Sequence, residues 1–152
     1  MEVFRLDQLT KELVTDKVRS MDDPCAEVAG IVKTTLDVAM RSAADDSKTR
    51  AGLIEDACRG GMTGLILTEQ NTARGAVLIL HRVVEIAARF AIDPMSAMEG
   101  ALKGIASLSR VMQPDRVQAM YYAVQAEFMG AGDLLLKLLD QAERAHKRAA
   151  AA

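Results

Sequence analysis

The chain has 152 residues, a length that fits one domain built around one hydrophobic core. Hydrophobic residues make up 50% of it, charged residues 26% and aromatic residues only 3%, and this balance favours helices over sheets. The formal net charge is −2, and a domain that holds a nucleic-acid backbone is normally basic, so we expect no general nucleic-acid binding.

The first helix is predicted over about Val3 to Arg19. Its apolar side recurs at helical spacing and consists of Leu6, Leu9, Leu13 and Val14. Charged and apolar residues are mixed from the start, with no basic stretch before an apolar run, so this segment does not predict a secretory signal.

Asp23-Pro24 opens the second helix, because aspartate is a strong N-cap and proline is favoured at the first helical position. A polar loop follows over residues 43–47. A third helix is predicted from about Thr49 to Thr68, although it contains Gly60-Gly61 and Gly64. Each interior glycine costs a helix about 1 kcal/mol relative to alanine. Either this helix breaks near Gly60-Gly61, or its glycines let another backbone come close.

The segment from Thr72 to Ala91 is the most apolar of the predicted helices. Its polar side chains fall on one narrow stripe, which consists of Arg74, His81, Arg82, Glu85 and Arg89. A surface helix usually has an apolar stripe of a little over ~100°, whereas here the polar stripe is that narrow. We therefore expect other helices to cover this one on most sides. Its longest uncharged run, 75–80, is far shorter than the about 20 residues that cross a bilayer, so we expect no membrane span.

Asp93-Pro94, Pro114 and Asp133 open three further helices, the first of them running as far as Met112. Gly130 and Gly132 are predicted to end the helix before Asp133. No segment shows the sustained period-two alternation of a strand. The sequence thus predicts an all-α protein in a single domain, 1–152. Its six or seven helices form a compact bundle around the central helix at about 72–91, and the last few residues are frayed.

The polar stripe of the central helix is the first candidate site. His81 and Glu85 lie one helical turn apart, a spacing that suits an acid–base couple or two metal ligands. Arg74, Arg82 and Arg89 would suit an anion such as a carboxylate or phosphate. The alternative is a solvated face with pairs four residues apart, so we assign no catalytic residue, no metal and no cofactor.

Small residues at helical spacing are the second candidate feature, and they comprise Gly60, Gly64, Ala97, Gly100 and Gly104. Such residues let two helix backbones approach closely. They suit either a helix crossing between two subunits or tight packing inside one chain. The two cysteines, Cys25 and Cys58, form no C-x-x-C pair, and we expect them to be small buried side chains in a reducing, cytoplasmic protein. A disulfide between them stays open.

Three functions are compatible with these patterns. The first is a non-catalytic helical interaction or assembly protein that acts through self-association or a protein partner, with a homo-oligomer, and a dimer above all, expected from its apolar excess. The second is a small-molecule binding module that holds an apolar ligand with an anionic head between helices, anchored by Arg74, Arg82 or Arg89. The third is an enzyme that uses His81 and Glu85.

Overall fold

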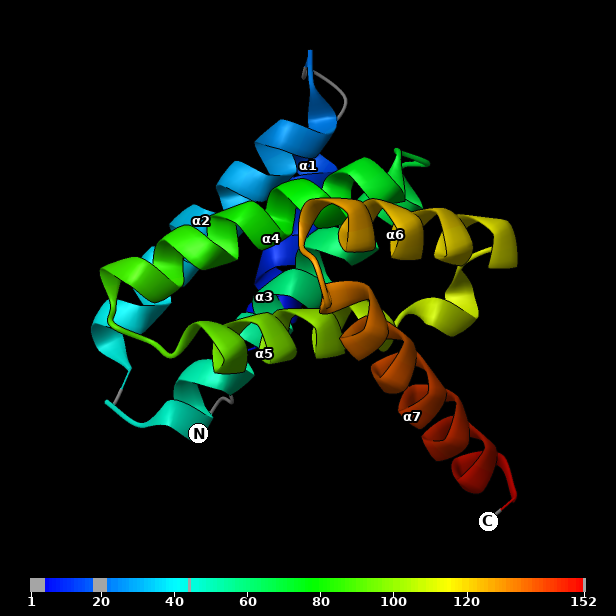
Figure 1. Ribbon diagram of the computed structural model, residues 1–152. Helices are drawn as coiled ribbons and strands as arrows, with labels where there is room; N and C mark the ends of the chain where they lie inside the picture. Colours follow the sequence, from blue (N-terminus) through cyan, green and yellow to red (C-terminus); the bar gives the residue numbers. More distant parts are fainter. Residues whose placement is uncertain (1–4, 18–21, 44, 152) are drawn as a thin grey trace.

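The computed structural model describes residues 5–17, 22–43 and 45–151. Within these ranges the chain forms seven α-helices, one short 3₁₀ turn and no strand, which confirms the predicted all-α bundle (Figure 1). The elements are α1 (Leu6–Lys17), α2 (Pro24–Ser42), α3 (Ser47–Leu67), α4 (Thr72–Arg89), α5 (Pro94–Ala106), η2 (Ser109–Val111), α6 (Pro114–Glu127) and α7 (Ala131–Ala151). The predicted ends of the first helix, at Val3 and Arg19, lie outside the described residues.

Short polar side chains start four of the helices. Each accepts a hydrogen bond from a backbone N–H of the first turn, which would otherwise have no partner inside the helix. These caps are Asp23 for α2, Asp46 for α3, Asn71 for α4 and Asp93 for α5. Proline stands in the first turn of α2, α5 and α6, where its missing N–H does no harm. The helix starts expected at Asp23-Pro24 and Asp93-Pro94 are confirmed.

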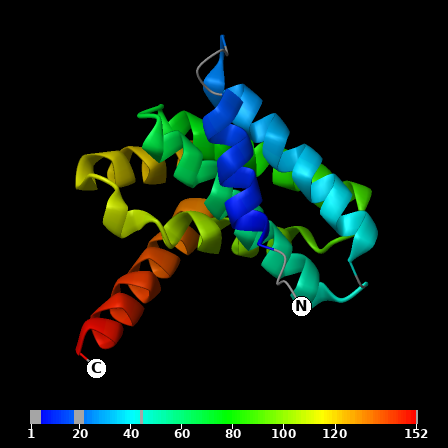
Figure 2. The ribbon, with the colours of Figure 1, turned by 180° about the vertical axis from the view of Figure 1, so that it is seen from behind.

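The apolar helix α4 is covered by α2, α3, α5 and α6. Its residues Ile79, Leu80, Val83 and Ile86 have no exposed surface, as its pattern predicts. The cover is incomplete at Val84, whose side chain is 45% exposed. α3 shares the central place, because it contacts α1, α2, α4 and α5 (Figures 1 and 2).

The third helix does not break at its glycines. It runs without interruption through Gly60-Gly61, and α1 and α5 pack directly onto its backbone. A Cβ at Gly60 would lie 2.8 Å from the Cβ of Thr10 in α1, and a Cβ at Gly100 of α5 would lie 3.0 Å from the carbonyl oxygen of Ala51 in α3. The close approach of another backbone is therefore the correct alternative for this helix.

Two expected helix boundaries were wrong. α5 ends at Ala106 instead of reaching Met112, because the Ser107 hydroxyl donates to the Gly104 carbonyl oxygen at 2.6 Å and the chain then turns through η2. Of the two glycines at 130 and 132, only Gly130 adopts a positive φ, of 89°. α7 therefore begins at Ala131, two residues before Asp133. α7 continues to Ala151, and the fraying expected of the last few residues stays a prediction.

The second half of α7 projects from the bundle (Figure 1). Its inner part is held by α5 and α6, where Leu135 and Leu138 are buried, whereas almost every residue after Leu139 is exposed. Within the described residues, no helix has both the length and the apolar character needed to cross a membrane.

Candidate functional site

The polar stripe of α4 is compensated by charges of neighbouring helices. The guanidinium of Arg74 lies 2.6 Å from the carboxylate of Asp23, the N-cap of α2, and that of Arg89 lies 2.9 Å from Asp37 within α2. The Arg74 hydrogen bond, with one from the Ala26 backbone N–H, holds the pKa of Asp23 below its usual value. These two arginines therefore link α4 to α2 and already have anionic partners.

The middle of the stripe is paired in the same way. Glu85 accepts from Lys33 of α2 at 2.5 Å and from Arg82 at 3.1 Å, and the Lys33 hydrogen bond lowers the pKa of Glu85. His81 does not pair with Glu85. Its Nε2 lies 2.7 Å from the carboxylate of Glu127 in α6, and its ring packs against Phe128 at 4.8 Å between centroids. The stripe thus forms polar seams between α4 and two of its neighbours, α2 and α6.

The polar stripe of α4 takes no part in the four hollows considered for the described residues. None of the four hollows that we describe is lined by Arg74, His81, Arg82, Glu85 or Arg89. Among the described residues, no group of three or more His, Cys, Asp and Glu side chains is arranged to hold a metal ion. A role of the stripe in binding a ligand or in catalysis stays a prediction without a cavity to support it.

The small residues proposed for a subunit interface are buried inside this chain. Gly60 and Gly64 pack against α1, and Gly100 and Gly104 pack against the backbone of α3. Ala97, one turn before Gly100, is 1% exposed. Their close contacts are thus made between helices of one chain, which is the alternative that the sequence left open.

Both cysteines are free and buried, as expected for small core side chains. Cys25 lies at the start of α2, with its Sγ 3.3 Å from the carbonyl oxygen of Asn71. Cys58 is completely enclosed in α3. Burial raises the pKa of both thiols, because a thiolate is poorly solvated in the core.

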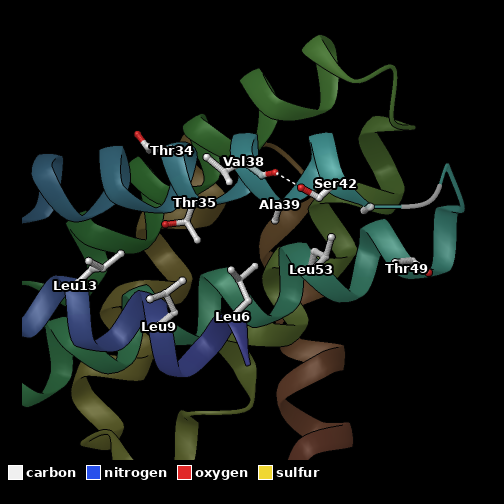
Figure 3. Close-up of a pocket in the computed structure, with 11 residues that line it drawn as sticks. Leu6, Leu9, Leu13, Thr34, Thr35, Val38, Ala39, Ser42, Thr49 and Leu53 are labelled. Carbon is white, nitrogen blue, oxygen red and sulfur yellow. Dashed lines mark hydrogen bonds between the residues drawn. The ribbon is translucent and has the colours of Figure 1, made fainter. Parts of the chain in front are cut away.

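The strongest candidate site is a groove between α1, α2 and α3, with a volume of about 680 Å³ (Figure 3). This volume is in the range of ligand and peptide sites. The lining is mainly aliphatic, with four hydroxyl groups and no charged side chain. It consists of Leu6, Leu9, Leu13, Thr34, Thr35, Val38, Ala39, Ser42, Ala43, Thr49 and Leu53. We call it the α1–α2–α3 groove.

Three aliphatic side chains leave much of their surface open around this groove. Leu9 is 38% exposed, Leu13 is 36% exposed and Val38 is 60% exposed. Figure 3 shows Leu6, Leu9 and Leu13 in a row on α1, facing the lining residues of α2. Single exposed apolar residues are ordinary, but their concentration around one uncharged groove is typical of a binding surface.

Sequence reasoning missed this groove, although it identified most of its apolar residues. Leu9 and Leu13 belong to the apolar side predicted for the first helix, but that pattern does not reveal that they stay partly open. Val38 lies off the buried side of α2, which includes Val32 and Leu36. Its position on the outer side of an otherwise regular amphipathic helix is the one signal that the sequence offers.

Comparisons with protein-family models, with curated protein sequences and with solved structures found no match to this chain. The function must therefore be argued from the chain's own residues.

Proposed function

We propose that this protein is a non-catalytic helical interaction protein that pairs with a second copy of itself through the α1–α2–α3 groove. The observation that carries the proposal is the chemistry of the groove. Leu9, Leu13 and Val38 are partly exposed around it, and none of the described residues that line it is charged. Covering such a surface with apolar side chains of a partner is favourable, because it removes apolar area from water.

A second copy suits this surface because the groove carries possible anchor residues of its own. Leu9 and Leu13 lie one turn apart on α1, the spacing with which a helix inserts anchor residues into a groove. Both line the groove and are partly exposed, and Val38 and Leu53 line it as well. A two-fold interface uses the same patch on both subunits, so Leu9 and Leu13 of each copy would pack into the groove of the other.

The other two functions have less support. An anion held by Arg74 or Arg89 would have to displace an existing carboxylate partner, Asp23 or Asp37. An enzyme that uses His81 with Glu85 would need the two side chains to act together, whereas His81 is engaged with Glu127.

The deciding experiment is sedimentation at micromolar concentration with Val38→Asp and a matched control, Tyr122→Asp. Val38 and Tyr122 are 60% and 61% exposed, and only Val38 lines the groove, so both variants should keep the fold. We expect the wild-type chain and Tyr122→Asp to sediment as dimers. Val38→Asp should sediment as a monomer, because a buried unpaired carboxylate at the interface opposes association. Circular dichroism should show equal helicity for all three.

A wild-type chain that stays monomeric at the highest attainable concentration would contradict the proposal. So would a dimer that Tyr122→Asp dissociates and Val38→Asp does not, since that result would place the interface on α6.

A further inference from the structure

A second groove lies on the opposite part of the bundle, between α7 and the chain through η2 and α6. Its volume is about 720 Å³, and its lining is Ser107, Ser109, Arg110, Met112, Pro114, Val117, Leu136, Leu139, Asp140, Ala142, Glu143, His146 and Lys147. We call it the α6–α7 groove. Unlike the α1–α2–α3 groove, it combines an aliphatic part with charged side chains. Its size is that of a site for a small organic ligand.

The aliphatic part of this groove is contributed by residues from three elements. Met112 follows η2, Val117 is on α6, and Leu136 and Leu139 are on α7. Met112 is 8% exposed, whereas Leu136 is 48% exposed, so the groove passes from a covered to an open side. A short alkyl chain would fit against these side chains and remove them from water.

Most charges that line the groove are already neutralised. Lys147 lies 3.3 Å from Glu143, and Asp140 lies 3.2 Å from Arg144, each pair being one turn apart on α7. The remaining charge among the lining residues is that of Arg110, in η2. Among the residues that the structure describes, no carboxylate forms an ion pair with it.

The contact that Arg110 does make is with an imidazole and not with a carboxylate. Its Nη1 lies 2.5 Å from Nδ1 of His146. Arg110 therefore has a full positive charge, uncompensated by an acid, beside an aliphatic groove.

Arg110 differs from the other described arginines because it lacks an ion pair with a carboxylate and also lines a groove with an aliphatic part. Only two further arginines in the described ranges, Arg116 and Arg148, also lack an ion pair with a carboxylate. Arg116 lines a smaller, mainly polar hollow beside Gln70, and Arg148 lines none of the four hollows described above.

We infer that the α6–α7 groove binds a small amphiphilic anion, an aliphatic carboxylate, with its head at Arg110 and its alkyl chain against Val117, Leu136 and Leu139. The guanidinium donates two parallel hydrogen bonds to a carboxylate, an arrangement for which its geometry is suited. The hydroxyl of Ser109, which also lines the groove, provides a further donor. This function goes beyond self-association and uses a separate surface.

Calorimetric titration of the full chain with decanoate, 1-decanol and acetate tests the inference. Decanoate supplies the head and the chain, decanol only the chain, and acetate only the head. We expect decanoate to bind more tightly than either. Arg110→Gln should weaken decanoate binding roughly tenfold and leave decanol binding unchanged, because only the charged head loses its partner. Arg148→Gln is the matched control, because it removes an exposed arginine near the end of α7. It should change the affinity for neither decanoate nor decanol.

Leu136→Asp is the second variant, and its 48% exposure makes it compatible with the fold. It should weaken the binding of both decanoate and decanol, since it places a carboxylate beside the alkyl chain of either ligand. Equal affinity of the wild-type chain and Arg110→Gln for decanoate would overturn the inference, as would loss of decanoate binding in Val38→Asp instead. Binding of an acidic amphipathic peptide at Arg110 without binding of decanoate would overturn the assigned ligand class. Since sedimentation reads out the other groove, failure of one proposal leaves the other intact.

Discussion

Replacing Gly104 by alanine tests the crossing of α5 over α3, where, among the described glycines, an added Cβ would come nearest to a backbone atom of another helix. A Cβ at this position would overlap the carbonyl oxygen of Glu55, lie 3.1 Å from its carbonyl carbon and lie 3.3 Å from the backbone nitrogen of Arg59. These are backbone atoms of a helix, which cannot rotate aside as a flexible side chain would. The two helices must therefore move apart.

The expected magnitude follows from two opposing contributions. Alanine in place of glycine stabilises a helix by about 1 kcal/mol. Overpacking typically costs 1–3 kcal/mol, and the upper half of that range, about 2–3 kcal/mol, applies where the backbone itself must shift. We expect a net loss of roughly 1–2 kcal/mol in the free energy of unfolding. For a chain of this length that lowers Tm by roughly 2–8 °C.

Gly52→Ala in α3 is the matched control. Gly52 is exposed, and a Cβ there would meet nothing within 4 Å, so only the helix-propensity gain remains. We expect an increase of about 1 kcal/mol and a Tm higher by roughly 2–4 °C. Thermal and urea unfolding followed by circular dichroism measures both variants. If Gly104→Ala stabilises the chain as much as Gly52→Ala does, the close crossing of α5 and α3 is refuted.

Three further predictions concern caps, pH and the core. Asp93→Ala should cost about 1 kcal/mol of stability, because the Asp93 side chain caps α5. Gln113→Ala should cost little, because the Gln113 side chain makes no cap hydrogen bond to α6. The urea unfolding midpoints of the two variants test this difference. The pKa of Glu85 is lowered in the folded chain, chiefly by the hydrogen bond from Lys33. The stability that the ionised Glu85 contributes is therefore present above the ordinary carboxyl pKa and is lost as the pH falls through the lowered pKa. Lys33→Met should therefore reduce the loss of unfolding free energy between roughly pH 5 and pH 3, as measured by urea titrations. A pH profile equal to that of the wild-type chain would contradict this prediction. Cys58 should resist a thiol reagent until the chain unfolds, since it is fully buried and burial raises its pKa; rapid labelling of the native chain would show that α3 is open there.

The polar stripe of α4 illustrates how far a candidate site can be predicted. The sequence identifies Arg74, Glu85 and Arg89 as the polar side of an apolar helix, and that description is correct. It does not identify their partners, Asp23 at the N-cap of α2 and Lys33 and Asp37 within α2, because those are 51 or 52 residues away. An unpaired arginine and a paired one look alike in sequence, although only the unpaired one is available to a ligand.

The sequence by itself determined the helices of this protein, because caps such as Asp23 and Asn71 and the spacing of apolar residues act over one or two turns. It also indicated Gly60 and Gly104 as candidates for close approach of two helices, with a helix break at Gly60-Gly61 left open. Only the tertiary structure decided that these glycines face α1 and α3 of the same chain, and that Leu9, Val38 and Arg110 remain open. The physical reason is that burial and charge compensation depend on which helices meet, and that choice is made by contacts between residues far apart in the chain.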